Sequence, residues 1–406
     1  MAFGYFIMTG TLTRPPARPA VLILLGCYLP GFKGGGPIRS IANLVAALGE
    51  EFSFKIVTGD RDLGDQLPFA DIVANRWVRV GQADVMYLGP GLRGMLGLCA
   101  LLGSIDRETG LYVNSFFATR FSILPVLLGW LKLCRPRYLV LAPRGEFSLG
   151  ALHFKRPRKR WFIWMSQRLG WHRDVIWQAS SPLEAADIRR QFPEANQVRI
   201  AEVIPTPDLA ALIAATSPER RAKKRGELHL VFVSRISRKK NLAGALKMLD
   251  GVSGQVYFDI FGPAEERDYF AECQRAIDAL PADIQVRYCG QIEHAEVARV
   301  FADHDLFLFP TFGENYGHVI SEALVAGCPV LISDQTPWRN LEAAGVGWDI
   351  PLNQPERFRS VLQQCVNGGQ EWHAALSIRA MDYGAKHAAS AATIDANRRL
   401  FQGQIA

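Results

Sequence analysis

Short apolar runs alternate along the chain with segments that carry apolar residues at helical spacing. Each run is bounded by Gly, Pro or polar residues, which is typical of buried strands in a parallel sheet. Strands are predicted at residues 21–25, 55–58, 85–88, 111–113, 138–142, 175–179, 228–233, 256–261, 285–289, 305–310 and 330–332. Helical segments lie between them, as in residues 38–48. The alternation predicts an α/β fold built on parallel sheets.

One stretch, residues 305–329, combines a predicted strand, a glycine loop and a helix. The helix is indicated by apolar residues at positions 319, 320, 323 and 324, and Gly327 and Pro329 end it. Gly313 and Gly317 bracket the loop, so its backbone amides can face a phosphate at the positive end of the helix.

Two glutamates stand in this stretch, eight positions apart. Glu314 lies in the loop and Glu322 lies in the helix. Both carboxylates could accept hydrogen bonds from the hydroxyls of a sugar and a ribose on either side of a pyrophosphate. The alternative is that both are solvated helix glutamates.

Three other loops carry candidate ligand-binding residues. Gly34, Gly35 and Gly36 precede a helix and would expose backbone amides to a ligand, or form a flexible turn. Arg235 and Lys240 follow the strand at 228–233 and could hold a pyrophosphate and stabilise charge on a leaving phosphate. The alternative there is a solvated basic turn.

Arg144 and Glu146 follow the strand at 138–142. Ligands bind at the carboxyl ends of parallel strands, so both are site candidates. A buried structural ion pair between them is the alternative. Two Asp-x-Asp patterns, at residues 60–62 and 303–305, match metal-dependent transferases, but so short a pattern recurs by chance and is discounted.

Composition describes a globular protein in a reducing compartment. The 406 residues are 49% hydrophobic and 21% charged, which suits two domains of ordinary size. The seven cysteines include no Cys-x-x-Cys pair, which argues against a disulfide framework or a zinc site. The longest apolar run, residues 121–134, carries Lys132 and is too short to span a bilayer. A cytoplasmic protein is therefore expected.

A net charge of +7 indicates an anionic partner. Between residues 147 and 173 there are seven Lys or Arg, interleaved with Trp161, Phe162, Trp164 and Trp171, and no acid. This composition predicts contact of residues 153–173 with an anionic membrane surface. A solvated helix whose tryptophans point into the core is the alternative. Nucleic acid is not expected as a partner, because the other cations lie at separate strand ends.

The domain boundaries follow from a break in the pattern. Prolines at 205 and 207 and the polar stretch 217–225 indicate an interdomain connection. We expect a first domain at residues 1–207, a second at 208–385, and a C-terminal helix at 386–406 that crosses back to the first.

Several of these motifs together resemble family 4 of the retaining GT-B glycosyltransferases, the group that builds bacterial lipopolysaccharide and exopolysaccharide. The likeness is carried by residues 34–40, Ser234-Arg235 with Lys240-Asn241, Gly262-Pro263, Glu314 and Glu322 with Gly327 and Pro329, and residues 143–147. The resemblance implies two Rossmann-like, doubly wound domains that face each other across a cleft.

The resemblance also implies a role for each residue. Arg235 and Lys240 would bind the diphosphate of a nucleotide-sugar, Glu314 the sugar and Glu322 the ribose. Asn315, Tyr316 and Gly317 would contact phosphate and sugar, and Gly35, Gly36 and Gly262 would approach the donor. No metal or other cofactor is expected, and the acceptor would be lipid-linked or a polysaccharide at the inner membrane face.

Two other activities fit the same motifs. A nucleotide-sugar epimerase of this fold would convert its donor without an acceptor, and a catalytically silent subunit would bind the donor without turnover. The sequence also departs from the family at three places. Many relatives have a histidine after the strand where this chain has residues 144–146. Thr206-Pro207 stands where an Asn-Gly turn is common, and His318 follows Gly317 where an aliphatic residue is frequent.

Overall fold

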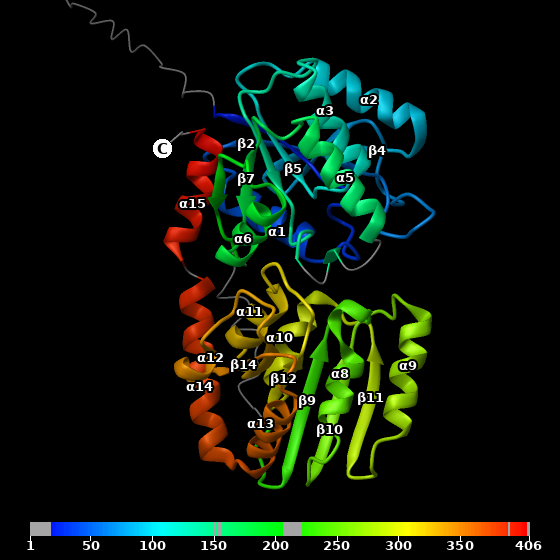
Figure 1. Ribbon diagram of the computed structural model, residues 1–406. Coiled ribbons are helices and arrows are strands. Elements are labelled where there is room, and N and C mark those ends of the chain that lie inside the picture. The colour runs from blue at the N-terminus through cyan, green and yellow to red at the C-terminus, as the bar shows by residue number, and fades with distance from the viewer. Residues whose placement is uncertain (1–17, 149–150, 153–155, 206–220, 389, 404–406) are drawn as a thin grey trace, which may run out of the picture.

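Two parallel sheets, one in each half of the chain, lie one above the other in the computed structural model (Figure 1). The structure describes residues 18–148, 151–152, 156–205, 221–388 and 390–403. The predicted interdomain connection and the boundary at 207/208 fall largely on residues 206–220, outside the described residues.

The first sheet has the strand order β3-β4-β2-β1-β5-β6-β7-β8. Its strands are β1 (Ala20–Leu24), β2 (Ser53–Gly59), β3 (Trp77–Val80), β4 (Ala83–Leu88), β5 (Gly110–Asn114), β6 (Leu139–Ala142), β7 (Ile176–Ala179) and β8 (Val198–Ile200). All neighbours are parallel except β3, which pairs antiparallel with β4. The predicted strands of this half are present, whereas β3 and β8 were not predicted because each is short and partly exposed.

Helices cover both faces of the first sheet. On one face α1 (Gly36–Leu48) and α15 (Ala391–Gln402) bury their apolar residues. On the other face lie α2 (Gly91–Gly103), the η1 turn (Thr119–Ile123) with α3 (Leu124–Trp130), α5 (Arg156–Arg168) and α6 (Pro182–Gln191). The central strand β1 therefore contributes alternate side chains to two cores, which explains its continuous apolar run.

The second sheet has the order β11-β10-β9-β12-β13-β14, and every neighbouring pair is parallel. Its strands are β9 (Glu227–Val233), β10 (Gln255–Phe261), β11 (Ile284–Gly290), β12 (Leu306–Phe309), β13 (Val330–Ser333) and β14 (Gly347–Ile350). The helical elements are η2 (Arg238–Lys240), α8 (Leu242–Met248), α9 (Arg267–Asp278), α10 (His294–Ala302), α11 (His318–Val325), α12 (Leu341–Ala344), α13 (Pro355–Asn367) and α14 (Gln370–Ala388).

The last helix, α15, packs on the first sheet and not on the second (Figure 1, red). The Phe401 ring lies 5.8 Å from the ring of Phe54 and 5.7 Å from that of Tyr112. The Tyr138 hydroxyl donates a hydrogen bond of 2.6 Å to the Phe401 carbonyl. The chain thus returns to its first half after completing the second.

Candidate active site

Loops from the carboxyl ends of both sheets meet between the two halves. Ser180 of the first half donates a hydrogen bond of 3.5 Å from its hydroxyl to the Asn315 carbonyl of the second. Gly145 faces the same asparagine and has φ +73°, and a Cβ at Gly145 would lie 3.2 Å from the Asn315 Cβ. Glycine therefore fits position 145 both in backbone conformation and in the space that the second half leaves.

The loop between β12 and α11 is held in place by backbone hydrogen bonds. The Phe312 amide donates to the Lys239 carbonyl at 2.9 Å, and the Glu314 amide donates to the Gln335 carbonyl at 3.0 Å. Gly317, with φ +81°, caps the N-terminus of α11. The free amides at that helix start are the feature that the sequence predicted for phosphate binding.

Lys240 and Glu314 form an ion pair at the carboxyl end of the second sheet. Both side chains are close to fully buried, with 12% and 13% of their surfaces exposed. The Lys240 ammonium also lies 5.4 Å from the centre of the Phe309 ring. A buried pair of this kind leaves a positive group that a phosphate could contact if Glu314 turned to a sugar hydroxyl.

Arg235 lies near this pair but is more exposed. Its guanidinium contacts the Glu265 carboxylate at 2.9 Å, and both side chains are more than one-third exposed. The alternative of a solvated basic turn describes Arg235 and Arg238, but not Lys240.

Glu322 is buried in α11 and forms an ion pair with Arg39 of α1, across the two halves. Burial raises the pKa of the Glu322 carboxyl, and the Arg39 guanidinium opposes that rise. The solvated-helix alternative is therefore wrong for Glu322. The predicted ribose ligand is held by a residue of the opposite half.

His318, the first residue of α11, also contacts the first half. Its Nε2 lies 3.0 Å from the Ser40 hydroxyl, and its Cδ2 would lie 3.7 Å from a Cβ added at Gly36. Burial, together with the positive charges of Arg39 and Arg144, lowers the pKa of His318 to about 3. The imidazole is neutral at physiological pH.

Asn315 and Tyr316, predicted to contact phosphate and sugar, differ in their surroundings. The Asn315 Oδ1 atom is buried and has no hydrogen-bond donor among the described residues. Such an atom is costly unless a ligand satisfies it. The Tyr316 ring packs 5.0 Å from the His318 ring, and its carbonyl accepts a hydrogen bond of 2.6 Å from Trp338 Nε1.

The predicted donor-binding glycines have different surroundings as well. Gly35 caps α1 with φ +67°, and a Cβ there would meet open space. Gly262 has φ +136°, and a Cβ there would lie 1.9 Å from the Ser234 carbonyl oxygen. Gly262 is therefore required by the close approach of the ends of β9 and β10.

Arg144 and Glu146 do not pair with each other within the described residues, so the ion-pair alternative is wrong. Arg144 donates to the Asn114 side chain at 2.7 Å and to the Tyr112 hydroxyl at 2.6 Å. Glu146 accepts from the Ser115 hydroxyl and from two backbone amides of residues 116–117. The Glu146 carboxylate thus stabilises the loop after β5.

Arg144 and Glu146 nevertheless line a cavity of about 490 Å³ in the first half. Asp60, Asp62, Arg120, Cys27 and the loop before α1 line it as well. Asp62 accepts hydrogen bonds from the Phe32 amide at 2.8 Å and from the Lys33 amide at 3.1 Å. Asp62 therefore holds the start of the glycine loop in place. The Asp-x-Asp pattern at residues 60–62 did not predict this role.

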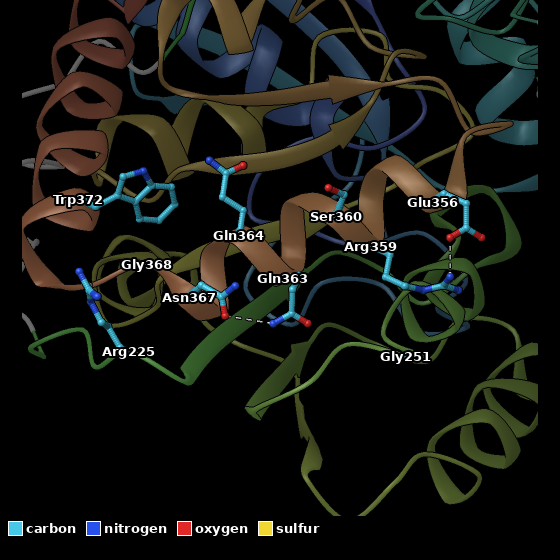
Figure 2. Close-up of a pocket in the computed structure, with 11 residues that line it drawn as sticks. Arg225, Gly251, Glu356, Arg359, Ser360, Gln363, Gln364, Asn367, Gly368 and Trp372 are labelled. Atoms are coloured by element: carbon cyan, nitrogen blue, oxygen red, sulfur yellow. Dashed lines mark hydrogen bonds and ion pairs between the residues drawn. The ribbon is translucent and has the colours of Figure 1, made fainter.

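A larger depression, of about 810 Å³, lies away from these residues (Figure 2). It is lined by α13 and by Arg225 and Gly251, which precede β9 and β10, so it sits at the amino end of the second sheet. None of the predicted site residues lines it. Among the described residues, no three His, Cys, Asp or Glu side chains cluster as metal ligands.

The basic segment carries exposed aromatic residues. Trp161 and Trp164 of α5 are 60% and 57% exposed, whereas Phe162 and Trp171 pack against the core of the first half. The alternative that the tryptophans point into the core is wrong for Trp161 and Trp164. Residues 153–155 lie outside the described residues. No helix in the described ranges is both long and apolar enough to cross a bilayer.

Known proteins resemble this chain in sequence over part of its second half and in fold over nearly its whole length. Residues 215–380 match the family described as Glycosyl transferases group 1. No curated protein sequence matches the chain. Among solved structures, HepE from Anabaena, crystallised with UDP and glucose, is similar with a TM-score of 0.66 at 13% identity, over 95% of this chain and 99% of that one.

Two further structures show the same likeness. Sucrose-phosphate synthase from Thermosynechococcus elongatus has a TM-score of 0.67 at 16% identity, over 95% of this chain and 100% of that one. WaaG, a glycosyltransferase involved in lipopolysaccharide biosynthesis, has a TM-score of 0.64 at 14% identity, over 95% and 100% of the chains. The chain therefore has the GT-B fold, and its residues 215–380 are similar to the group 1 glycosyltransferases.

Proposed function

We propose that the protein transfers a sugar from a nucleotide-sugar to a lipid-linked or polysaccharide acceptor, with retention of anomeric configuration and without a metal ion. One observation carries the proposal: the buried ion pair of Lys240 and Glu314 lies at the carboxyl end of the second sheet, in the same loops as Arg235, and the next residue, Asn315, contacts the first half. The HepE structures with UDP and with UDP-glucose support the same class of donor.

The residues suggest how each end of the donor would be held. Lys240 and Arg235 would exchange their carboxylate partners for the diphosphate, while the amides at the start of α11 face it. Glu314, released from Lys240, would accept hydrogen bonds from the sugar hydroxyls. Glu322 would exchange Arg39 for the ribose hydroxyls. In these exchanges Arg235, Lys240, Glu314 and Glu322 each gain a ligand group in place of the partner they lose, whereas Arg39 and Glu265 are released.

The transfer step would follow from that arrangement. The bond between the anomeric carbon and the diphosphate oxygen breaks, and the acceptor oxygen forms a bond to the same face of that carbon. The acceptor's proton passes to the leaving phosphate oxygen. Arg235 and Lys240 would stabilise the charge that develops on the diphosphate, which is the work a metal ion does in other transferases.

The first half would supply the acceptor side and the membrane contact. The helices α2, α3 and α5 lie on one face of the first sheet. Exposed apolar side chains there include Leu96 of α2, Leu133 after α3, and Trp161 and Trp164 of α5. Residues 91–103, 119–137 and 156–173 contain no Asp or Glu. An apolar surface with cations and no acids suits an anionic membrane.

A panel of UDP-, GDP-, ADP- and CMP-linked sugars, screened by thermal shift, tests the donor. At least one should raise the melting temperature of the wild-type chain, and Lys240→Gln should reduce that rise. Incubation of the bound donor without an acceptor separates the rival activity, since an epimerase would alter the sugar and a transferase would not. Failure of every nucleotide-sugar to bind would contradict the proposal.

A further inference from the structure

Four cations lie within six residues after the carboxyl end of β9, namely Arg235, Arg238, Lys239 and Lys240, and they differ in their partners. Three of the cations have carboxylates: Arg235 contacts Glu265, Arg238 contacts Glu272, and Lys240 contacts Glu314. Lys239 makes no side-chain hydrogen bond or ion pair with any described residue. A partly buried ammonium without a counterion is unfavourable for folding. Lys239 is therefore a candidate for binding an anionic ligand.

The Lys239 side chain lies at the boundary between the two halves. Its Cε atom is 3.8 Å from the point where a Cβ at Gly313 would stand, and the Ser148 hydroxyl of the first half is 3.7 Å from the same point. Ser148 accepts a hydrogen bond of 3.3 Å from the Ala151 amide, and its hydroxyl can still donate a hydrogen bond to a ligand.

The backbone of Lys239 is fixed by the loop that would hold the donor. Its carbonyl accepts hydrogen bonds from the Phe312 amide at 2.9 Å and from the Thr311 hydroxyl at 3.2 Å. Lys239 therefore follows the Gly313 loop whenever that loop moves. The side chain is positioned next to the diphosphate site, toward the first half.

Positive charge from both halves surrounds this place. Burial lowers the pKa of the Lys239 ammonium, and Lys240, Arg235 and Lys159 of the first half lower it further, against the effect of Glu314. Lys159 donates a hydrogen bond of 2.7 Å to the Ala151 carbonyl and lies 5.1 Å from the centre of the Phe117 ring. These neighbours would favour an anion between the two halves.

We propose that Lys239, with Ser148, binds a second anionic group of the substrates, a phosphate or carboxylate distinct from the donor diphosphate. The inference rests on the proposed function, because Arg235 and Lys240 are there assigned to the diphosphate. The anion is carried either by the acceptor or by the transferred sugar. Either source places a negative charge between the Gly313 loop and Ser148.

Inorganic phosphate is the probe. The full-length chain is saturated with the nucleoside diphosphate that binds most tightly among UDP, GDP and ADP, and phosphate is then titrated by calorimetry. We expect phosphate to bind to the saturated wild-type protein. Lys239→Gln should weaken phosphate binding by about ten- to a hundredfold, the range for losing a hydrogen bond to a charged group, and leave the nucleotide affinity unchanged.

Two variants control for charge. Arg238→Gln removes the same charge from the neighbouring position and should leave phosphate binding unchanged, whereas Lys239→Arg should retain most of it. Equal losses in the Lys239→Gln and Arg238→Gln variants would show a general field effect and overturn the inference. A parallel loss of nucleotide affinity in Lys239→Gln would also overturn it, by placing Lys239 in the diphosphate site.

Comparing the binding of a nucleotide-uronic acid with that of the matching nucleotide-hexose identifies which substrate carries the anion. If Lys239→Gln weakens a nucleotide-uronic acid and spares the matching nucleotide-hexose, the anion belongs to the sugar. If both bind as before and only phosphate is lost, the anion belongs to the acceptor. A wild-type protein that binds nucleotide but not phosphate refutes the second anion site alone, whereas absence of nucleotide binding refutes the proposed function as well.

Discussion

Arg39 of α1 and Glu322 of α11 form an ion pair that joins the first half of the protein to the second. Glu322 is buried and the Arg39 side chain is about one-third exposed, with 34% of its surface accessible. The carboxylate predicted to bind ribose is thus paired with an arginine of the other half. Nucleotide binding would have to displace Arg39, so the contact between the halves and occupancy of the site are coupled.

Arg39→Gln should weaken the contact between the two halves and strengthen nucleotide binding. The free energy of unfolding should fall by about 1–2 kcal/mol, between the values for exposed and buried ion pairs. Nucleotide affinity should rise severalfold, because the ribose no longer competes with a guanidinium. Calorimetry measures the free energy of unfolding and the nucleotide affinity, and small-angle scattering measures how closely the two halves stay together. Arg79→Gln, which breaks the exposed pair with Asp84, is the control, and weaker nucleotide binding in Arg39→Gln would contradict this coupling.

Lys240→Ala should reduce kcat/KM by about two to three orders of magnitude, equivalent to about 3–4 kcal/mol, as expected for loss of one group that stabilises a developing anion. The assay is release of nucleotide in the presence of acceptor. Arg238→Ala, whose side chain contacts Glu272, should retain activity near the wild-type value. Wild-type turnover in Lys240→Ala would contradict the mechanism.

Alanine substitutions at Gly262 and Gly35 should lower stability for different reasons, a steric clash at Gly262 and backbone conformation alone at Gly35. Gly262→Ala places a Cβ 1.9 Å from a carbonyl oxygen, so the chain must shift and we expect a loss above about 3 kcal/mol or failure to fold. Gly35→Ala meets open space and should cost less, about 1–3 kcal/mol, the penalty for a residue with a side chain at φ +67° and ψ −133°. Urea unfolding measures both, and equal losses would contradict the assignment.

Acidification should weaken the protein through His318. Its pKa is about 3 in the folded chain against an ordinary 6.5, so the unfolded state binds the proton more readily. The stabilisation is present above pH 6.5 and is lost as the pH falls toward 3. Arg39, Arg144 and His294 are the charged or titratable neighbours that disfavour the protonated ring.

The measurement compares unfolding at pH 7.5 and pH 5 in wild type and His318→Gln. Wild type should lose up to about 2 kcal/mol more than the variant over that interval. His387→Gln, which removes an exposed histidine, should behave as wild type. The same pH dependence in wild type and His318→Gln would exclude His318 as the group responsible.

Full-length protein should bind vesicles that contain anionic lipid and bind neutral vesicles weakly. Replacing Trp161 and Trp164 together by Ser should reduce vesicle binding by about tenfold or more. Each exposed indole would bury apolar surface in the membrane, and about 1.4 kcal/mol of lost burial is enough for a tenfold change. Trp77→Ser, at an exposed position on β3, is the matched control. Co-sedimentation measures the fraction bound, and undiminished binding in the double variant would contradict the surface assigned to α5.

Local pattern was sufficient to predict most strands and the loops at their carboxyl ends. The stretch around Glu314 combined a wholly apolar strand, loop glycines and a helix, and the structure shows all three. The strands β3 and β14 were not predicted, because β3 alternates exposed and half-buried residues and β14 contains Gly and Asp. Edge strands have one unpaired side and need less apolar surface.

The partners of the site residues could not be predicted from spacing. Arg39 and Glu322 are 283 positions apart, and their contact depends on how one half is placed on the other. Glu146 was identified as a site residue from its position after β6, yet its hydrogen bonds go to the loop after β5. A strand end identifies which residues are near a ligand but not what each side chain contacts.

The position of Phe401 affects the order in which the protein can be completed during synthesis. The ring is buried among Phe52, Phe54 and Tyr112, so part of the interior of the first half is supplied by α15. Residues 18–205 emerge from the ribosome long before that helix, and until then an apolar groove stays open on their sheet. A nascent chain stalled before residue 391 would lack this cover and expose apolar residues of the first half to chaperones and proteases until α15 is made.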